Sequence, residues 1–205
     1  WIYPKRTALA YKGLARNKAI EFDNYDYSLL KNKVKGTEYI TGRFYLPPLL
    51  EKMIYENVQY NFRIRSVHPD HQYLENSKME TGRFINNSDL LKYRKVAVIG
   101  QMIENEVFPK QDPIGQWIEI GGINFQIVGV FSDNGGEDEM RMIYIPITTA
   151  QRSFSEKTPI SQLMLTTGTA NLEEVKRIEA SIRQQLAQKH QFDVNDQQAI
   201  RIRNR

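Results

Sequence analysis

The chain has 205 residues, which is enough for one large domain or for two smaller lobes that each have a hydrophobic core. Hydrophobic residues make up 40% and charged residues 25%, as in ordinary globular proteins. The net charge of +4 comes from basic residues spread along the chain, and no nucleic-acid-binding motif accompanies them. The absence of cysteine excludes disulfides, thiolate chemistry and cysteine-bound metals.

The sequence also contains no candidate membrane span. No apolar run approaches the roughly twenty residues that a spanning helix needs, and the N-terminus lacks a signal-peptide pattern. The chain starts at Trp1 rather than at methionine. We therefore expect a piece cut from a longer protein, from which membrane anchors and any signal segment have been removed.

The first third of the chain predicts a strand, a helix and a second strand. Residues 1–18 are irregular, with proline and glycine as breakers, and residues 19–22 favour the first strand. Asp26 is a candidate N-cap for a helix that continues to Val34. Residues 38–45 then favour the second strand.

Residues 57–67 predict a strand with one face exposed to solvent, because hydrophobic and polar residues alternate along it. A polar loop containing His68 follows and leads to Gly82. The residues on the hydrophobic face of the predicted strand are Val58, Tyr60, Phe62 and Ile64.

Residues 82–131 contain the clearest local patterns. The short apolar run at residues 96–99 predicts a buried strand. Ile103 and Val107 lie one helical turn apart, and Pro109 predicts the end of this short helix.

A hairpin follows the turn formed by residues 112–115. Hydrophobic and polar residues alternate on both sides of Gly121-Gly122, a pair suited to a primed two-residue turn. Gly129 lies inside the second strand, where it predicts a β-bulge or a close packing contact.

The chain after this hairpin begins with a polar, acidic loop at residues 132–139. A short strand is predicted at residues 143–145, where Pro146 ends it. Thr148 or Thr149 is a candidate cap for the helix that reaches Phe154.

The last part predicts a strand at residues 161–167, the longest helix, and a final strand at residues 199–202. Asn171 and Glu174 have the spacing of a capping box, which predicts the start of this helix. A stripe of apolar residues along the helix predicts the face that it buries. The stripe consists of Leu172, Val175, Ile178, Ile182 and Leu186.

The order of these elements predicts a mixed fold of the α+β or α/β class. Strand, helix and strand occur at residues 19–45 and again at residues 161–203, with a mostly β region between them. We expect two βαβ-type units to form one lobe and the β-rich region to form an inserted lobe. The predicted boundaries place residues 1–66 with 158–205 in the first lobe and residues 67–157 in the second.

An ordered series of short motifs resembles the periplasmic core domain of MacB-type and FtsX-like ABC transporter permeases. The motifs follow one another at close spacing over about fifty residues, which makes the series more specific than any single motif. They are GRF at residues 82–84 with Asp89, KVAVIG, Phe108-Pro109, DPIG, an I-x-I pair, G-x-x-F and IVGVF.

This resemblance implies the extracytoplasmic domain of a permease in the inner membrane, with porter-like and sabre-like lobes. It implies no enzymatic activity in the domain, since ATP is hydrolysed on a cytoplasmic nucleotide-binding domain. It also implies mechanotransmission, in which movement of the transmembrane helices of the same chain is relayed to export or release of a substrate. The implied partners are a second permease subunit, the ATPase, and a periplasmic adaptor or lipoprotein.

Two groups of side chains are candidate metal sites, and neither is expected to bind a metal. His68, Asp70 and His71 lie in a proline-containing segment, which is more typical of a surface loop than of a metal site. Asp133 and residues 137–139 lack the spacing of a calcium loop and suit a solvated loop.

No catalytic or cofactor-binding residue is predicted, since the sequence has no phosphate-binding glycine motif or hydrolase nucleophile motif. His190, near the end of the longest helix, is expected to interact with the helix dipole. Several tyrosines in or near β segments are candidates for a protein-binding patch. They are Tyr39, Tyr45, Tyr55, Tyr60 and Tyr73.

A second hypothesis keeps the extracytoplasmic location but makes the chain a ligand-sensing domain of a membrane receptor. It predicts a closed apolar pocket that contains a few convergent polar groups. A hydrolase is a third and weaker hypothesis, because no serine has a recognisable hydrolase context.

Overall fold

A computed structural model describes residues 1–168 and 170–204. The chain forms two compact units. The first unit contains residues 1–42 together with the chain from residue 158 onward, and the second unit contains residues 43–157.

The first unit contains strand–helix–strand twice, as predicted from the order of elements. In both cases a strand leads into a helix and the helix leads into another strand, which confirms the two βαβ-type units. Its elements are β1 (Ile2–Pro4), β2 (Phe22–Asp23), α1 (Asn24–Lys33), β3 (Tyr39–Tyr45), β12 (Pro159–Ile160), β13 (Gln162–Thr166), α6 (Leu172–His190) and β14 (Ile200–Ile202).

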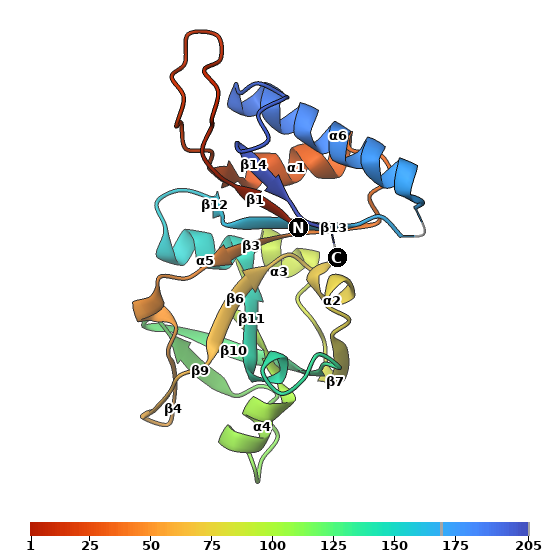
Figure 1. Cartoon of the computed structure of the whole chain (residues 1–205). Helices are drawn as coiled ribbons and strands as arrows, with labels where there is room; N and C mark the ends of the chain where they lie inside the picture. Colours follow the sequence, from red (N-terminus) through yellow and green to blue (C-terminus); the bar gives the residue numbers. More distant parts are fainter. Residues whose placement is uncertain (169, 205) are drawn as a thin grey trace. The chain divides into compact units, whose positions relative to one another are not determined.

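The strands of this unit are ordered β14-β1-β13-β3, and β2 pairs with β12 in a separate ribbon. Figure 1 shows α1 and α6 on the same side of β1, β13 and β14. The prediction for residues 1–18 missed β1, because a strand of three residues leaves no readable alternation. The predicted strand at residues 19–22 is reduced to Phe22 followed by Asp23.

Helix α1 begins one turn earlier than predicted. Its N-cap is Asp23, whose carboxylate accepts hydrogen bonds from the backbone N–H of Tyr25 and Asp26. The prediction that Asp26 is the N-cap was therefore wrong. Asp26 is the third helical residue, and its carboxylate accepts a hydrogen bond from the backbone N–H of Asp23.

Helix α6 confirms the predicted capping box, in which Asn171 and Glu174 satisfy each other's backbone N–H groups. The predicted apolar stripe is buried from Ile178 onward. Its first residues are not part of the core, because Leu172 is 69% exposed and Val175 is only half-buried.

The second unit is built around a mixed sheet ordered β3-β6-β11-β8-β10-β9-β4-β5, with β7 paired to β10. The helices α2 to α5 are short and connect these strands. Besides the end of β3, its strands are β4 (Met53–Tyr55), β5 (Val58–Tyr60), β6 (Arg63–Val67), β7 (Lys78–Gly82), β8 (Val96–Gly100), β9 (Trp117–Ile120), β10 (Ile123–Ser132) and β11 (Met142–Pro146). Its helices are α2 (His71–Leu74), α3 (Asn87–Leu91), α4 (Gln101–Val107) and α5 (Ile147–Phe154).

The predictions for residues 96–131 are confirmed. Strand β8 is fully buried, α4 ends before Pro109, and β9 and β10 form the hairpin. Gly129 has both predicted properties. The register of β10 against β8 shifts between Ile127 and Gly129. A Cβ on Gly129 would also lie only 2.1 Å from the carbonyl oxygen of Arg83.

The single strand predicted at residues 57–67 is wrong. The alternating pattern spans two strands, because β5 pairs with β4 while β6 pairs with β3 and β11. Val58 is consequently 50% exposed at the end of the sheet, whereas Ile64 is completely buried.

The boundary between the units differs from the predicted one at residues 66 and 67. The division falls after Gly42, inside β3. Residues 43–66 include β4 and β6, which pair with β9 and β11 of the second unit. The assignment of the two units as porter-like and sabre-like lobes stays a proposal.

The predicted threonine cap of α5 was also wrong. The N-cap position is Pro146, which has no side chain able to accept a hydrogen bond. The hydroxyl groups of Thr148 and Thr149 instead donate to the backbone carbonyls of Leu90 and Arg94, at 2.7 and 2.8 Å. These two bonds attach α5 to the segment around α3.

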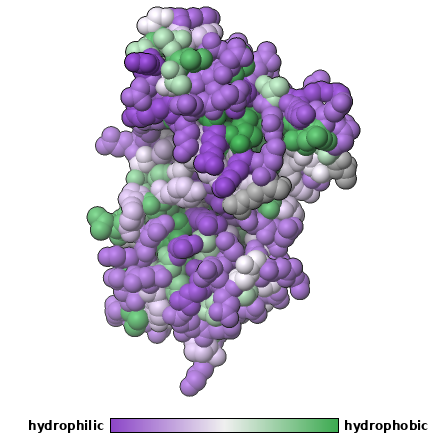
Figure 2. Space-filling model, in the orientation of Figure 1, coloured by the Kyte–Doolittle hydropathy of each residue, from purple (hydrophilic) through white to green (hydrophobic). Residues whose placement is uncertain are grey.

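No helix among the described residues combines the length and apolar character that crossing a bilayer requires. The face drawn in Figure 2 is mostly hydrophilic, with hydrophobic residues in small separate groups.

Candidate functional site

The first unit pairs the two ends of the described chain. Strand β1 is antiparallel to β14, with Ile2 opposite Ile202. The carbonyl of Trp1 accepts a hydrogen bond from the backbone N–H of Arg203 at 2.8 Å. Backbone hydrogen bonds therefore join the first and last strands of the described chain directly.

Asp196 attaches the segment after β1 to the turn between α6 and β14. Its carboxylate accepts the backbone N–H groups of Ala8 and Leu9 at 2.8 and 2.9 Å. It also accepts those of Gln198 and Ala199 within its own turn, at 3.0 and 3.2 Å. Burial raises the pKa of Asp196, but these four hydrogen bonds outweigh burial and leave the pKa lowered.

A network of charged groups around the buried Asp26 joins α1 to the end of α6. The side chain of Asp26 is completely buried and lies 2.8 Å from Lys189 Nζ and 2.7 Å from His190 Nε2. Lys189 Nζ also lies 2.5 Å from the carboxylate of Asp23. We call Asp23, Asp26, Lys189 and His190 the α1–α6 network. His190 was expected to interact with the helix dipole, and its direct partner is the Asp26 carboxylate.

The pKa shifts agree with this pairing. Burial lowers the pKa of Lys189, but hydrogen bonds to Asp23 and Asp26 outweigh it and leave the pKa raised. Burial likewise raises the pKa of Asp23, and the bond from Lys189 then contributes to a net lowering. Both shifts favour the charged forms, so the ion pair between α1 and α6 is maintained at neutral pH.

A second polar network explains part of the motif series. Asp89 is completely buried and accepts two hydrogen bonds from the Arg83 guanidinium, at 2.7 and 3.1 Å. It also accepts the backbone N–H of Asn86 at 2.9 Å. Arg83 of the GRF motif and Asp89 therefore fix the loop between β7 and α3, which is a structural role.

The prediction of a surface loop at His68 and His71 was wrong. His68 is 4% exposed and His71 is fully buried against Tyr144, with the two ring centroids 4.7 Å apart. Among the residues that the structure describes, neither ring nitrogen of His71 has a hydrogen-bond partner. Burial, followed by the charges of Arg43 and Arg65, holds the pKa of His71 well below its usual value.

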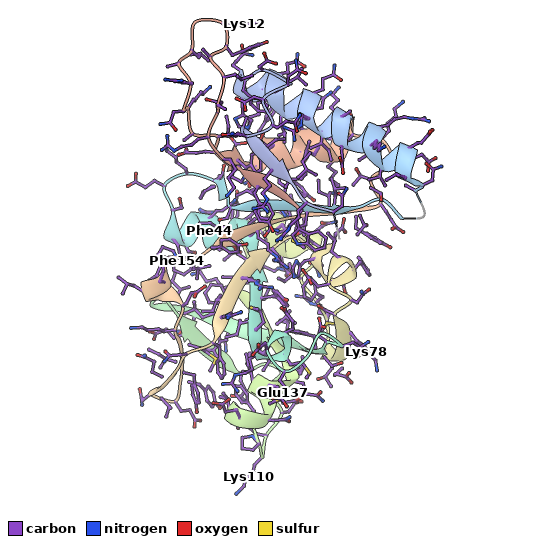
Figure 3. All side chains as sticks on the ribbon, in the orientation of Figure 1. Lys12, Phe44, Lys78, Lys110, Glu137 and Phe154 are labelled. Atoms are coloured by element: carbon purple, nitrogen blue, oxygen red, sulfur yellow. The ribbon has the colours of Figure 1, made fainter. Side chains whose placement is uncertain are left out.

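The acidic loop after β10 is exposed from Asn134 to Asp138, in agreement with the solvated loop predicted there. Figure 3 labels Glu137 within it. Across residues 1–168 and 170–204, no three histidine or carboxylate side chains form a group suited to a metal ion. The expectation that the chain has no catalytic, cofactor or metal residue stays a prediction.

The candidate tyrosines do not share one environment. Tyr45 and Tyr73 are 46% and 51% exposed, Tyr55 is buried, and Tyr39 and Tyr60 are half-buried. A protein-binding patch made of all five is therefore not present.

Sequence reasoning missed the α1–α6 network. Lys189 and Asp26 are 163 residues apart, so no local spacing links them. The only available signal was the position of basic residues in the last turn of α6, which was interpreted as a dipole interaction.

The comparisons with known proteins agree with the motif series. The profile of the MacB-like periplasmic core domain matches residues 2–185, which is most of the chain. The chain belongs to the MacB-like periplasmic core domain family. It is therefore an extracytoplasmic domain of a MacB-like ABC transporter permease.

Two curated relatives are named as macrolide export ATP-binding/permease proteins MacB. The protein from Bdellovibrio bacteriovorus is 24% identical over 179 residues, covering 84% of this chain and 26% of the relative. The protein from Azoarcus sp. is 34% identical over 110 residues, covering 52% of this chain and 16% of the relative. This chain therefore spans about a quarter or less of the length of these relatives.

Two solved structures have the same fold. The periplasmic region of MacB from Actinobacillus actinomycetemcomitans matches with a TM-score of 0.76 at 16% identity, over 99% of this chain and 86% of that chain. The extracellular domain of the noncanonic ABC-type transporter YknZ from Gram-positive bacteria matches with a TM-score of 0.78 at 15% identity. That match covers 99% of this chain and 98% of the other. Both confirm the mixed α+β architecture.

Proposed function

We propose that this domain relays ATP-driven movement of transmembrane helices to an event outside the membrane. The event is export or release of a substrate, or a change in a periplasmic partner. ATP is bound and hydrolysed on a separate cytoplasmic domain or subunit. The domain works in a dimer with a second permease subunit and contacts a periplasmic adaptor or a lipoprotein.

The observation that carries this proposal is the pairing of β1 with β14 in a member of the MacB-like family. Helices attached before β1 and after β14 would act on neighbouring strands of one sheet. A relative displacement of those helices would therefore exert force on the backbone hydrogen bonds between β1 and β14. It would not act on two distant parts of the domain.

A relay must also be stiff enough to move as a body. Asp196 joins the segment after β1 to the turn before β14, and the α1–α6 network joins both helices. A buried ion pair is costly to break, because the remaining charge loses its partner away from water. These contacts support the transmission of movement from the terminal strands to α6 and α1. They oppose local unfolding, which would otherwise absorb that movement.

The alternative of a ligand-sensing domain has less support. It predicts a closed apolar pocket, whereas the groove of about 600 Å³ in the first unit is open and partly lined by charged residues. The family match also favours a permease domain.

The proposal can be tested by hydrogen–deuterium exchange on the full-length permease in nanodiscs, with and without ATP under conditions that prevent hydrolysis. We expect ATP to change the exchange of amides in β1, β14 and α6. The isolated 205-residue chain is the control and should show no response to ATP. Exchange changes confined to the cytoplasmic and transmembrane parts would contradict the relay.

A further inference from the structure

The first unit has a surface groove between the end of α1 and the first half of α6. Its volume is about 600 Å³, within the size range of small-molecule sites. The groove is formed by the loop after α1, by Thr167 and Ala170 before α6, and by one face of α6. Its lining residues include Lys33, Lys35, Ala170, Glu174, Arg177 and Ile178.

The floor of the groove is apolar. Ile178 is 7% exposed and packs against Gly36, where an added Cβ would lie 2.9 Å from the Ile178 Cδ1 atom. Gly36 also has a φ of +89°, a backbone conformation that residues other than glycine rarely adopt. The glycine therefore lets the loop after α1 close directly onto Ile178 and complete the floor.

The rim of the groove is cationic. Lys33, Lys35 and Arg177 line it, against the single lining carboxylate of Glu174. That carboxylate already accepts the backbone N–H of Asn171 at 2.9 Å. In the described part of the chain, Lys33 and Lys35 form no salt bridge, and Arg177 has only an exposed contact of 4.0 Å with Glu173.

The first turn of α6 also carries an exposed apolar side chain, which is not among the residues that line the groove. Leu172 is 69% exposed, although it belongs to the stripe that is buried farther along the helix. In Figure 2 a hydrophobic group lies at the right of the upper part, where Figure 1 places the start of α6. The groove itself combines a positive rim with an apolar floor.

We propose that this groove binds a small amphipathic anion, with a carboxylate or phosphate head group and a hydrocarbon tail. The head group accepts charge-assisted hydrogen bonds from Lys35 and Arg177. The tail covers Ile178 and Ala170 on the floor of the groove. The proposal does not depend on the relay function, because it concerns only the local chemistry of the first unit.

Isothermal titration calorimetry on the 205-residue chain tests this site with decanoate and decyl phosphate below their micellar concentrations. We expect saturable binding of at least one of them, and the stronger ligand identifies the head-group chemistry. Decyl maltoside has a similar tail without charge, and acetate and inorganic phosphate have the charge without the tail. All three should bind at least tenfold more weakly. Equal binding of decyl maltoside, or no saturable binding of either anion, would overturn the proposal.

Charge-removal variants localise the binding. Lys35→Met and Arg177→Met should each weaken it about tenfold, the expected scale for one charge-assisted hydrogen bond. Lys31→Met and Lys176→Met are matched controls, since these lysines are exposed on α1 and α6 close in sequence to Lys35 and Arg177 and do not line the groove. Circular dichroism confirms folding of each variant. An equal loss in the control variants would show nonspecific attraction to a basic surface and overturn the assignment.

Discussion

His71 is the clearest case of a single residue whose environment determines its chemistry. It lies in the second unit between Tyr144 and Phe84, with ring centroids 4.7 and 6.5 Å away. The positive groups acting on it are Arg43, Arg65 and His68. Glu75 and Glu139 are engaged with the two arginines. Protonation of His71 would therefore add an unpaired charge to the core.

This environment predicts an acid sensitivity. The folded-state pKa of His71 lies well below 6.5, so the unfolded chain binds more protons as the pH falls through that value. Stability is then lost below about pH 6.5, by up to about 1.4 kcal/mol per pH unit. In urea unfolding at pH 7.5 and 5.5, His71→Phe should reduce this loss, since phenylalanine suits an aromatic site and does not titrate. An identical loss in both proteins would contradict this account.

Asp89 illustrates a buried charge that needs its partners. Asp89→Asn removes the charge that Arg83 binds through two hydrogen bonds, and the asparagine amide cannot accept both. We expect a loss of about 3 kcal/mol in the free energy of unfolding, measured by urea denaturation. Glu173→Gln is the control, since its contact with Arg177 is solvent-exposed and should contribute almost nothing. A loss no larger than that of the control would contradict the structural role of the motif.

Among the elements, α1 depends on α6 for its stability. It has only ten residues, and isolated helices of that length are marginal in water. Its tertiary contacts include Leu30, which is completely buried, and the α1–α6 network. The network is therefore expected to determine how easily α1 opens.

Asp26→Asn tests this dependence in the isolated chain. The variant leaves Lys189 and His190 without the buried carboxylate that both contact. Amide exchange in α1 should accelerate at least tenfold relative to the wild type, because local opening becomes less costly. Lys31→Met is the matched control on the same helix and should leave exchange unchanged. Equal exchange rates in Asp26→Asn and wild type would show that the network does not hold α1.

The elements also show which features the sequence could predict. The capping box of α6 and the hairpin around Gly121-Gly122 depend on residues a few positions apart, and both predictions are confirmed. The partners of Asp26 could not be predicted, because they lie on a helix 163 residues later. The burial of His71 was missed for a similar reason. Its own segment is polar, and the aromatic residues that cover it come from other elements.

For the whole molecule, the central claim is that the domain moves when ATP acts elsewhere in the permease. The chain contains no cysteine, so a single introduced cysteine is a unique labelling site within it. Figure 3 shows Lys110 at an outer turn of the second unit, after α4. Lys110 is exposed, and a label there should leave the core intact.

The most direct test is the distance between spin labels on Lys110→Cys in the two subunits of the full-length permease. The permease would be otherwise free of cysteine and reconstituted in nanodiscs, and distances would be measured by pulsed electron paramagnetic resonance. We predict that the distance distribution shifts between the nucleotide-free and ATP-bound states, and that the shift shrinks when Asp26→Asn loosens the α1–α6 network. A distribution that is the same in both nucleotide states would contradict the relay.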